Sequence, residues 1–203
     1  MAVLRTLQTW LPRRWRRAAL INETLWQQTL GALPFIAEQS AKDLERLRDL
    51  CAHFLQEKEF HGAHGLTITD AMVLRIAAQA CLPLLHMRLP GGERAQRAVQ
   101  LLAWYDDFVG IVVQPGTAIA QREVTDPAGV VHRYSEALAG EAMERGPVML
   151  AWDEVARAGT LASEGRNVVI HEFAHKFDMH AEARGRGADG APPLPAGYCG
   201  QAD

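Results

Sequence analysis

The stretch of sequence that decides the fold lies between residues 167 and 179 and reads Asn167-Val-Val-Ile-His-Glu-Phe-Ala-His-Lys-Phe-Asp-Met179. On an α-helix, residues four positions apart lie one turn apart on the same face. His171 and His175 can therefore reach one ion, while Glu172 borders the same pocket. Asn167 suits the N-cap of such a helix. The spacing predicts a helix that carries a metal site.

Two histidines and an open coordination position suit Zn²⁺, which polarises a carbonyl group and lowers the pKa of a bound water to about 7. Glu172 then takes the proton of that water as it attacks and passes it to the leaving nitrogen. The chain contains eight histidines, which raises the chance that so short a motif arises at random. The apolar back of the helix, with Phe173 and Phe177, favours the functional interpretation. We expect His171 and His175 to be metal ligands and Glu172 to be the general base.

A catalytic zinc usually has three protein ligands, and the third is not evident. One common arrangement places a histidine ten residues after the first, beyond a glycine at the seventh, but those positions hold Ala181 and Asp178. Asp178 shares the face of the two histidines and is better placed to orient an imidazole than to bind the ion. A ligand on a later helix, beyond the last residue, is another possibility. Further candidates, none favoured by its spacing, are His180, Glu182, Asp189 and Asp203.

Four separated blocks of the sequence carry a resemblance to a known family. They are residues 77–83, 140–148, 167–179 and 192–194, which read AAQACLP, GEAMERGPV, NVVIHEFAHKFDM and PPL. Together they resemble the Mlc titration factor A family of bacterial zinc metallopeptidases, over about residues 33 to 198. Several blocks in the same order are much more specific than the pentapeptide alone.

The resemblance implies a gluzincin-type site in which His171 and His175 match the metal ligands and Glu172 the general base. In that family the third ligand is a glutamate on a helix further downstream, and no segment before Asp203 matches it. We therefore expect either a shortened chain or an incomplete site.

Composition fits one globular domain. A chain of 203 residues with 48% hydrophobic residues can bury one sizeable core, and a net charge of −3 argues against a general nucleic-acid-binding surface. The three cysteines, Cys51, Cys81 and Cys199, are odd in number and far apart, which favours a reducing, cytoplasmic compartment. No apolar run approaches the roughly 18 residues needed to cross a bilayer.

Residues 1–22 form a basic segment with five arginines, two tryptophans and no acidic residue. It does not read as a secretory signal, because its charges interrupt the apolar residues. Such a segment can bind an anionic membrane surface or an acidic partner, but a solvated, poorly ordered leader is favoured. We expect residues 23–203 to form a single metallopeptidase-like domain that lacks its C-terminal helices.

The pattern of apolar residues predicts an α+β fold, with a helical N-terminal half, a small mixed β-sheet and then the metal-binding helix, in a minimal gluzincin-like arrangement. One helix begins after Ser40, with Asp43 in its first turn, and another runs from Thr69 or Asp70 to Pro83. A third, short helix is expected at residues 95–104. Strands are expected at residues 108–114, 130–134 and 147–152.

Two classes of function follow. The first is a zinc metallopeptidase, either aminopeptidase-like or protein-cleaving, that holds an extended peptide against the edge of the sheet. Residues 146–152 are the candidate edge, and an ordinary buried strand is the equal alternative. The second class is a non-catalytic protein that sequesters a transcriptional repressor of sugar-uptake genes, an activity that the family name implies. A role in regulating sugar uptake is compatible with both.

Overall fold

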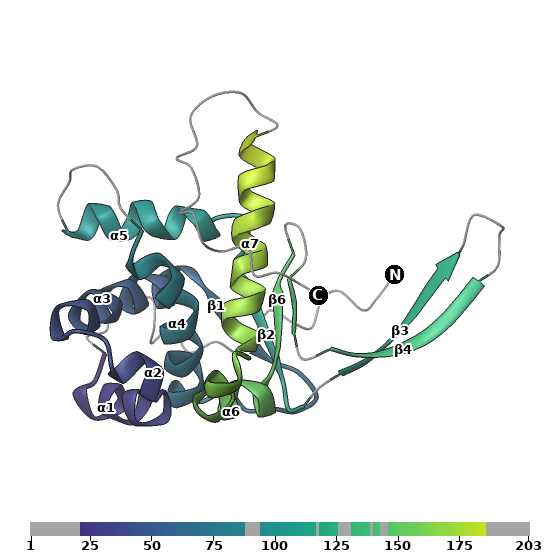
Figure 1. The fold of residues 1–203 in the computed structure, drawn as a ribbon, viewed down its shortest axis with the longest axis horizontal. Helices are drawn as coiled ribbons and strands as arrows, with labels where there is room; N and C mark the ends of the chain where they lie inside the picture. The colour runs from purple at the N-terminus through teal and green to yellow at the C-terminus, as the bar shows by residue number, and fades with distance from the viewer. Residues whose placement is uncertain are drawn as a thin grey trace.

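The computed structural model describes residues 21–87, 94–116, 118–125, 131–138, 140–142 and 146–185. They form an α+β fold, as predicted, in which a group of helices packs beside a small sheet and the helix α7 (Val168–Gly185) lies between the two (Figure 1). In this part of the chain, no helix is both long and apolar enough to cross a bilayer. The basic segment predicted at residues 1–22 lies almost wholly outside the described residues.

The helical half begins with two helices that the sequence did not predict. They are α1 (Glu23–Ala32) and α2 (Pro34–Ala37). The helix predicted after Ser40 is α3 (Ala41–Glu57), and the hydroxyl of Ser40 accepts a hydrogen bond from the amide of Asp43 at 3.2 Å. The helix predicted after Thr69 is α4 (Asp70–Leu85), which continues two residues beyond Pro83. Capping residues therefore located both helix starts correctly.

The sheet has the strand order β1-β2-β6-β5, with β1, β2 and β6 parallel and β5 antiparallel to β6. Two of its strands, β2 and β6, were predicted, whereas β1 and β5 were not. After α4 the chain passes through α5 (Arg94–Leu102) and the short 3₁₀ helix η1 (Ala103–Tyr105) before it enters β2. The strand bounds are β1 Glu59–Gly62, β2 Gly110–Gln114, β5 Gly140–Ala142 and β6 Val148–Ala151.

For residues 146–152 the sequence left an edge strand and an ordinary buried strand as equal alternatives, and the structure supports the buried strand. Within this range, β6 pairs with β2 on one side and with β5 on the other. The edge strand beside α7 is therefore β5, at Gly140–Ala142. Trp152 does not belong to the strand, because it begins helix α6 (Trp152–Leu161).

Two strands that lie between β2 and β5 in the sequence form a separate antiparallel ribbon. Its strands are β3 (Ala118–Thr125) and β4 (Val131–Leu138), with a register that runs from Ala118 opposite Leu138 to Thr125 opposite Val131. Figure 1 shows the ribbon extending away from the helices. β4 begins near the predicted strand at residues 130–134 and is longer, because pairing with β3 continues it to Leu138.

The core joins α7 to the helical half through aromatic rings. Phe173 of α7 is fully buried, and its ring centroid lies 5.0 Å from that of Tyr105 and 5.8 Å from those of Phe54 and Phe108. The hydroxyl of Tyr105 donates to the carbonyl of Ala80 at 2.8 Å.

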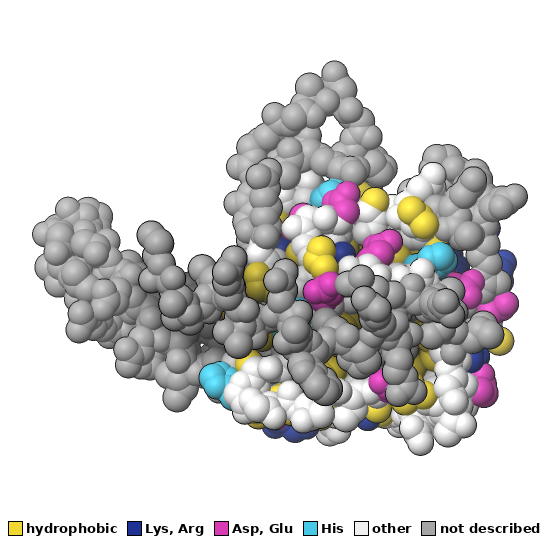
Figure 2. Space-filling view, turned by 180° about the vertical axis from the view of Figure 1, so that it is seen from behind, with side chains coloured by type: hydrophobic (Ala, Val, Ile, Leu, Met, Phe, Trp, Pro, Cys, Tyr) yellow, Lys and Arg dark blue, Asp and Glu magenta, His cyan; other side chains and the backbone are white. Residues whose placement is uncertain are grey.

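Figure 2 views the molecule from behind relative to Figure 1 and shows acidic side chains scattered among hydrophobic and other side chains of the described residues.

Candidate metal centre

Helix α7 begins where the sequence places its cap. A 3₁₀ turn, η2 (Ala162–Glu164), ends at Gly165, whose φ of 73° is in the left-handed region that glycine adopts without strain. Asn167 then caps α7. Its Oδ1 accepts from the amide of Ile170 at 2.9 Å, and its carbonyl accepts from the amide of His171 at 3.0 Å. The first turn of α7 is therefore held by Asn167, as predicted.

The two imidazoles lie together on the exposed face of α7. The Nε2 atoms of His171 and His175 are 3.1 Å apart, and the ring planes meet at 84°. Two nitrogens at zinc-ligand distance, separated by a tetrahedral angle, would be roughly 3.3 Å apart. The pair suits one shared ion or, between neutral rings, one shared proton. Measured metal content distinguishes these two states.

Glu172 lies in the same turn but in a different environment. Its side chain is only 5% exposed, whereas both imidazoles are exposed. Successive helical residues are rotated by about 100°, so Glu172 flanks the histidine face rather than sharing it. The Glu172 carboxylate is therefore shielded from bulk water, whereas the two imidazoles are open to a ligand.

The side of α7 opposite the histidines contains a buried charge that the sequence reasoning missed. Lys176 is fully buried, and its ammonium donates to Asp107 Oδ2 at 3.0 Å and to the carbonyl of Gly146 at 3.1 Å. It also lies 4.8 Å from the centroid of the Phe108 ring. Lys176 thus ties α7 to the segments that precede β2 and β6. The sequence does contain one sign of this buried charge, because Lys176 directly precedes Phe177 on the apolar side of the predicted helix.

A second buried lysine approaches the same aromatic ring. The ammonium of Lys58 lies 4.3 Å from the centroid of Phe108 and donates to the backbone carbonyls of Tyr105 and Phe108, the latter at 2.7 Å. Burial lowers the pKa of Lys58, and the nearby carboxylates of Glu57 and Asp107 oppose that effect. The loop between η1 and β2 is therefore held by lysines from two different helical segments.

The candidates for a third ligand fare differently. His180 lies nine residues after His171, which is half a turn out of phase. Its ring packs 5.4 Å from Trp104, and its Nδ1 lies 3.6 Å from Asp106 Oδ1. His180 is therefore excluded as a partner of the two histidines. Asp178 is exposed on α7.

The remaining candidates receive no support from the described coordinates. Glu182 is within α7, but the placement of its side chain is not described, and Asp189 and Asp203 lie outside the described residues. Across the described residues, no group of three or more histidines, cysteines, aspartates and glutamates could hold a metal ion. Burial raises the pKa of the Cys81 thiol well above its usual value, with the thiol of Cys51 as its neighbour, so Cys81 does not read as a thiolate ligand.

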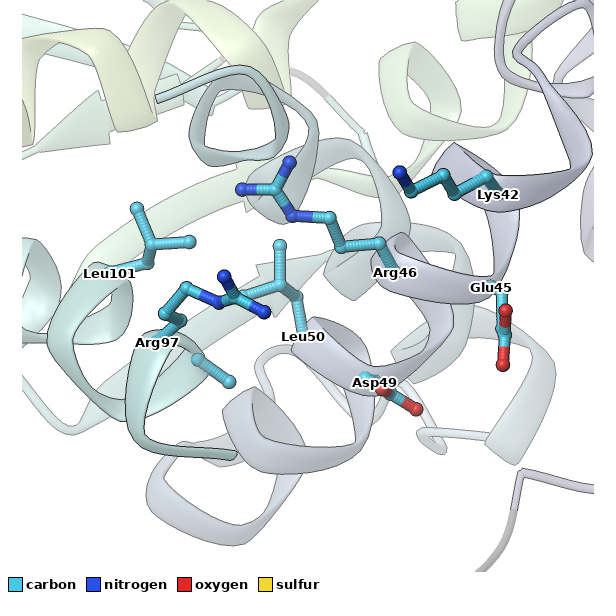
Figure 3. A pocket seen from close by; sticks show the side chains of 8 residues that line it. Lys42, Glu45, Arg46, Asp49, Leu50, Arg97 and Leu101 are labelled. Carbon is cyan, nitrogen blue, oxygen red and sulfur yellow. The ribbon is translucent and has the colours of Figure 1, made fainter. Parts of the chain in front are cut away.

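A groove of about 240 Å³ lies elsewhere, between α3 and α5. Arg46, Leu50, Arg97 and Leu101 are among its lining residues, and their side chains are drawn in Figure 3. None of its lining residues belongs to α7, so it is not part of the candidate metal centre.

A capped helix with a histidine pair, packed beside a small mixed sheet, is compatible with a metallopeptidase-like protein. Comparison with known proteins agrees, and the chain belongs to the glucose-regulated metallo-peptidase M90 family, whose model matches residues 7–201. It is also similar to Mlc titration factor A of Klebsiella pneumoniae, with 31% identity over 173 residues, and of Yersinia pestis, with 30% identity over 169 residues. The resemblance inferred from the four sequence blocks is therefore confirmed.

These matches differ in how much of each protein they include. They cover 85% and 83% of this chain but only 58% and 56% of the Klebsiella and Yersinia proteins. The chain thus spans somewhat more than half the length of the relatives it matches.

Proposed function

We propose that this chain carries the metal-binding helix of a zinc metallopeptidase, with His171 and His175 as two of the ligands and Glu172 as the general base. The observation that carries the proposal is the 3.1 Å separation of the two Nε2 atoms on the exposed face of a capped helix. Membership of a metallopeptidase family supports it.

The proposed chemistry divides between the metal and the protein. When bound, zinc would supply Lewis acidity, which lowers the pKa of a coordinated water to about 7 and polarises a carbonyl. Glu172 would accept the proton of the attacking water and deliver it to the leaving nitrogen. His171 and His175 would hold the ion through Nε2, on a helix whose opposite side is anchored in the core.

The edge strand β5 is the proposed binding element for an extended peptide. Among the described strands it pairs with β6 alone, and it packs against α7, so a substrate strand added at its other edge would lie beside the metal helix. Backbone hydrogen bonds would fix the scissile carbonyl with little dependence on side chains, which suits either an aminopeptidase-like or a protein-cleaving activity. We place the activity in the cytoplasm, on the basis of the free thiols of Cys51 and Cys81.

A Glu172→Gln variant tests the proposed base. It should retain zinc and lose zinc-dependent hydrolysis of peptide or aminoacyl substrates by roughly 10²- to 10⁴-fold, because the amide cannot accept the proton. Glu164→Gln is the matched control, since Glu164 is an exposed carboxylate upstream of the helix. Undiminished hydrolysis by Glu172→Gln would refute the role of the base.

Zinc content tests the ligands. The purified protein should contain zinc, and a His171→Ala, His175→Ala double variant should contain none. Because the described residues provide two imidazoles and no third ligand beside them, substoichiometric zinc is expected in the 203-residue chain. Equal metal content in the two proteins would rule out the assigned ligands.

The third ligand separates two versions of the site. If it is the downstream glutamate implied by the family, a form extended past Asp203 by the corresponding segment of a family member should bind zinc about 10- to 100-fold more tightly. If Asp178 or Glu182 completes the site instead, the 203-residue chain should bind zinc fully and lose it on substitution of that carboxylate by alanine. Zinc affinities of both lengths decide between these versions.

A second candidate function is sequestration of a transcriptional repressor. It is favoured by the name of the relatives, Mlc titration factor A. Binding of Mlc by this chain, measured with wild type and with Glu172→Gln, separates the two functions, because removal of the base should abolish hydrolysis and leave binding intact. A wild-type chain that binds Mlc and hydrolyses nothing would favour sequestration.

A further inference from the structure

We infer that Gln79, a buried residue of α4, is a positioning residue for the metal site and acts on His171 through Asn167. This inference rests on the proposed function, since positioning matters only if the histidines bind a metal. Asn167 Nδ2 donates to Gln79 Oε1 at 2.8 Å, so the Gln79 side chain contacts the residue that caps α7.

 The contact is direct and joins α4 to the start of α7.

Four hydrogen bonds form one continuous chain. Gln79 Nε2 donates to the carbonyl of Arg75 at 3.0 Å, and Gln79 Oε1 accepts from Asn167. Asn167 Oδ1 accepts from the amide of Ile170 at 2.9 Å, and the Asn167 carbonyl accepts from the amide of His171 at 3.0 Å. The chain runs from the core of α4 to the backbone of the first metal ligand.

The donor and the acceptor of each hydrogen bond in this series are fixed. If the Gln79 amide were flipped, its oxygen would face the Arg75 carbonyl and its nitrogen would face the nitrogen of Asn167. If the Asn167 amide were flipped, its nitrogen would face the amide of Ile170. Each flip brings two donors or two acceptors together, so the network assigns both amides one orientation.

Burial makes the arrangement rigid where the histidines themselves are not. The Gln79 side chain is fully buried, so an amide group left without its partner has no water to replace it. His171 and His175 are exposed, and core packing does not hold their rings. The direction of His171 therefore depends on the backbone of the first turn, which Asn167 and Gln79 hold.

Ordinary helix capping does not need Gln79. Serine, threonine or aspartate at position 167 would also accept from the amide of Ile170. A carboxylate accepts from Ile170 but cannot donate to Gln79, whereas the asparagine amide does both through separate atoms. Asn167→Asp therefore separates the two roles, because it keeps a good cap and brings two acceptors together at Gln79.

The experiment uses the full 203-residue chain. Zinc affinity is measured by competition with a chromophoric chelator, and hydrogen exchange of the Ile170 and His171 amides is measured in the metal-free protein. Gln79→Met, which keeps the side-chain length without the amide, and Asn167→Asp should each weaken zinc binding about 10-fold or more. Both should also speed exchange of the two amides. The double variant should lose little more than either single variant, because both break the same chain.

Thr29→Val is the matched control for lost stability. Thr29 is buried, and its hydroxyl donates to the carbonyl of Leu25 within α1, away from α7. It should alter neither zinc affinity nor exchange at the start of α7. Unchanged zinc affinity in Gln79→Met, or an equal loss in Thr29→Val, would overturn the positioning role. Failure of the proposed function looks different, since wild type would then bind no zinc through His171 and His175 while exchange still responded to Gln79→Met.

Discussion

The two sides of α7 differ in what they contact, although their residues alternate within the same turns. One side presents His171 and His175 to solvent, with their Nε2 atoms 3.1 Å apart. The other side buries Phe173, Lys176 and Phe177 against aromatic rings and the Asp107 carboxylate. The candidate chemistry and the stability of the fold therefore depend on different residues of one helix. Substitutions on the two sides should have separable effects, and the predictions below begin with the largest expected change in unfolding free energy.

The largest change is expected for Phe173→Ala. The side chain is fully buried and contacts the rings of Phe54, Tyr105 and Phe108, so its removal leaves a cavity that these rings cannot readily fill. We expect the free energy of unfolding to fall by about 3–5 kcal/mol. Urea denaturation of the metal-free protein measures it. A loss below about 1 kcal/mol would show that the core does not depend on this side of α7.

For Lys176→Met we expect the free energy of unfolding to fall by about 3 kcal/mol. This is the low end for a broken buried ion pair, because the Asp107 side chain remains 19% exposed. The methionine keeps most of the apolar stem but leaves the Asp107 carboxylate without its ammonium. Replacing both residues, as Lys176→Met with Asp107→Leu, should recover part of the loss, since the pair is then absent rather than broken. The single variant Asp107→Leu completes the comparison. If the loss of the double variant equals the sum of the two single losses, the two residues do not interact directly.

The sequence predicted those elements whose signals are local. Ser40, Thr69 and Asn167 each mark a helix start, and the apolar spacing after each of them is helical. Strands β1 and β5 were missed because little in their own residues favours a strand. β1 contains the single buried residue Phe60, and β5 is Gly-Glu-Ala, so both owe their conformation to pairing with β2 and β6.

The same distinction applies to the candidate site. The spacing of His171 and His175 follows from helix geometry alone, and the structure brings their nitrogens together. The partners of Lys176 come from residues 107 and 146, which no local pattern connects to α7. His180 was a reasonable ligand candidate by residue type, yet the phase of the helix turns it towards Trp104. The phase of His180 could have been read from its spacing, whereas the partners of Lys176 depend on long-range contacts that one sequence does not contain in readable form.

A smaller, pH-dependent effect is expected from Lys58, the other lysine beside Phe108. Burial lowers its pKa in the folded state below the ordinary lysine value of about 10.4. Between the lowered pKa and about 10.4, the unfolded chain binds more protons than the folded chain, so stability from this group rises with pH and is lost as pH falls through the folded pKa.

The measurement is the difference in unfolding free energy between wild type and Lys58→Met across this pH range. The unfolding free energy of wild type should rise relative to that of Lys58→Met as the pH rises, because the buried ammonium becomes neutral. Lys42→Met, which changes an exposed lysine of α3, is the control. A difference that stays constant with pH would contradict a desolvated Lys58.

The smallest change in stability is expected on the exposed side, from His171→Ala together with His175→Ala. Neither imidazole is buried, and alanine has a higher helix propensity than histidine, so the metal-free variant should unfold within about 0.5 kcal/mol of the metal-free wild type. The same variant should lose all zinc-dependent stabilisation, which for a bound ligand grows with the ratio of free zinc to its dissociation constant. Thermal unfolding with and without added zinc measures both quantities in one series. A large loss of stability without metal would break the comparison, because the histidine side would then support the fold as the aromatic side does. Equal stabilisation of wild type and variant by zinc would instead place the metal away from α7.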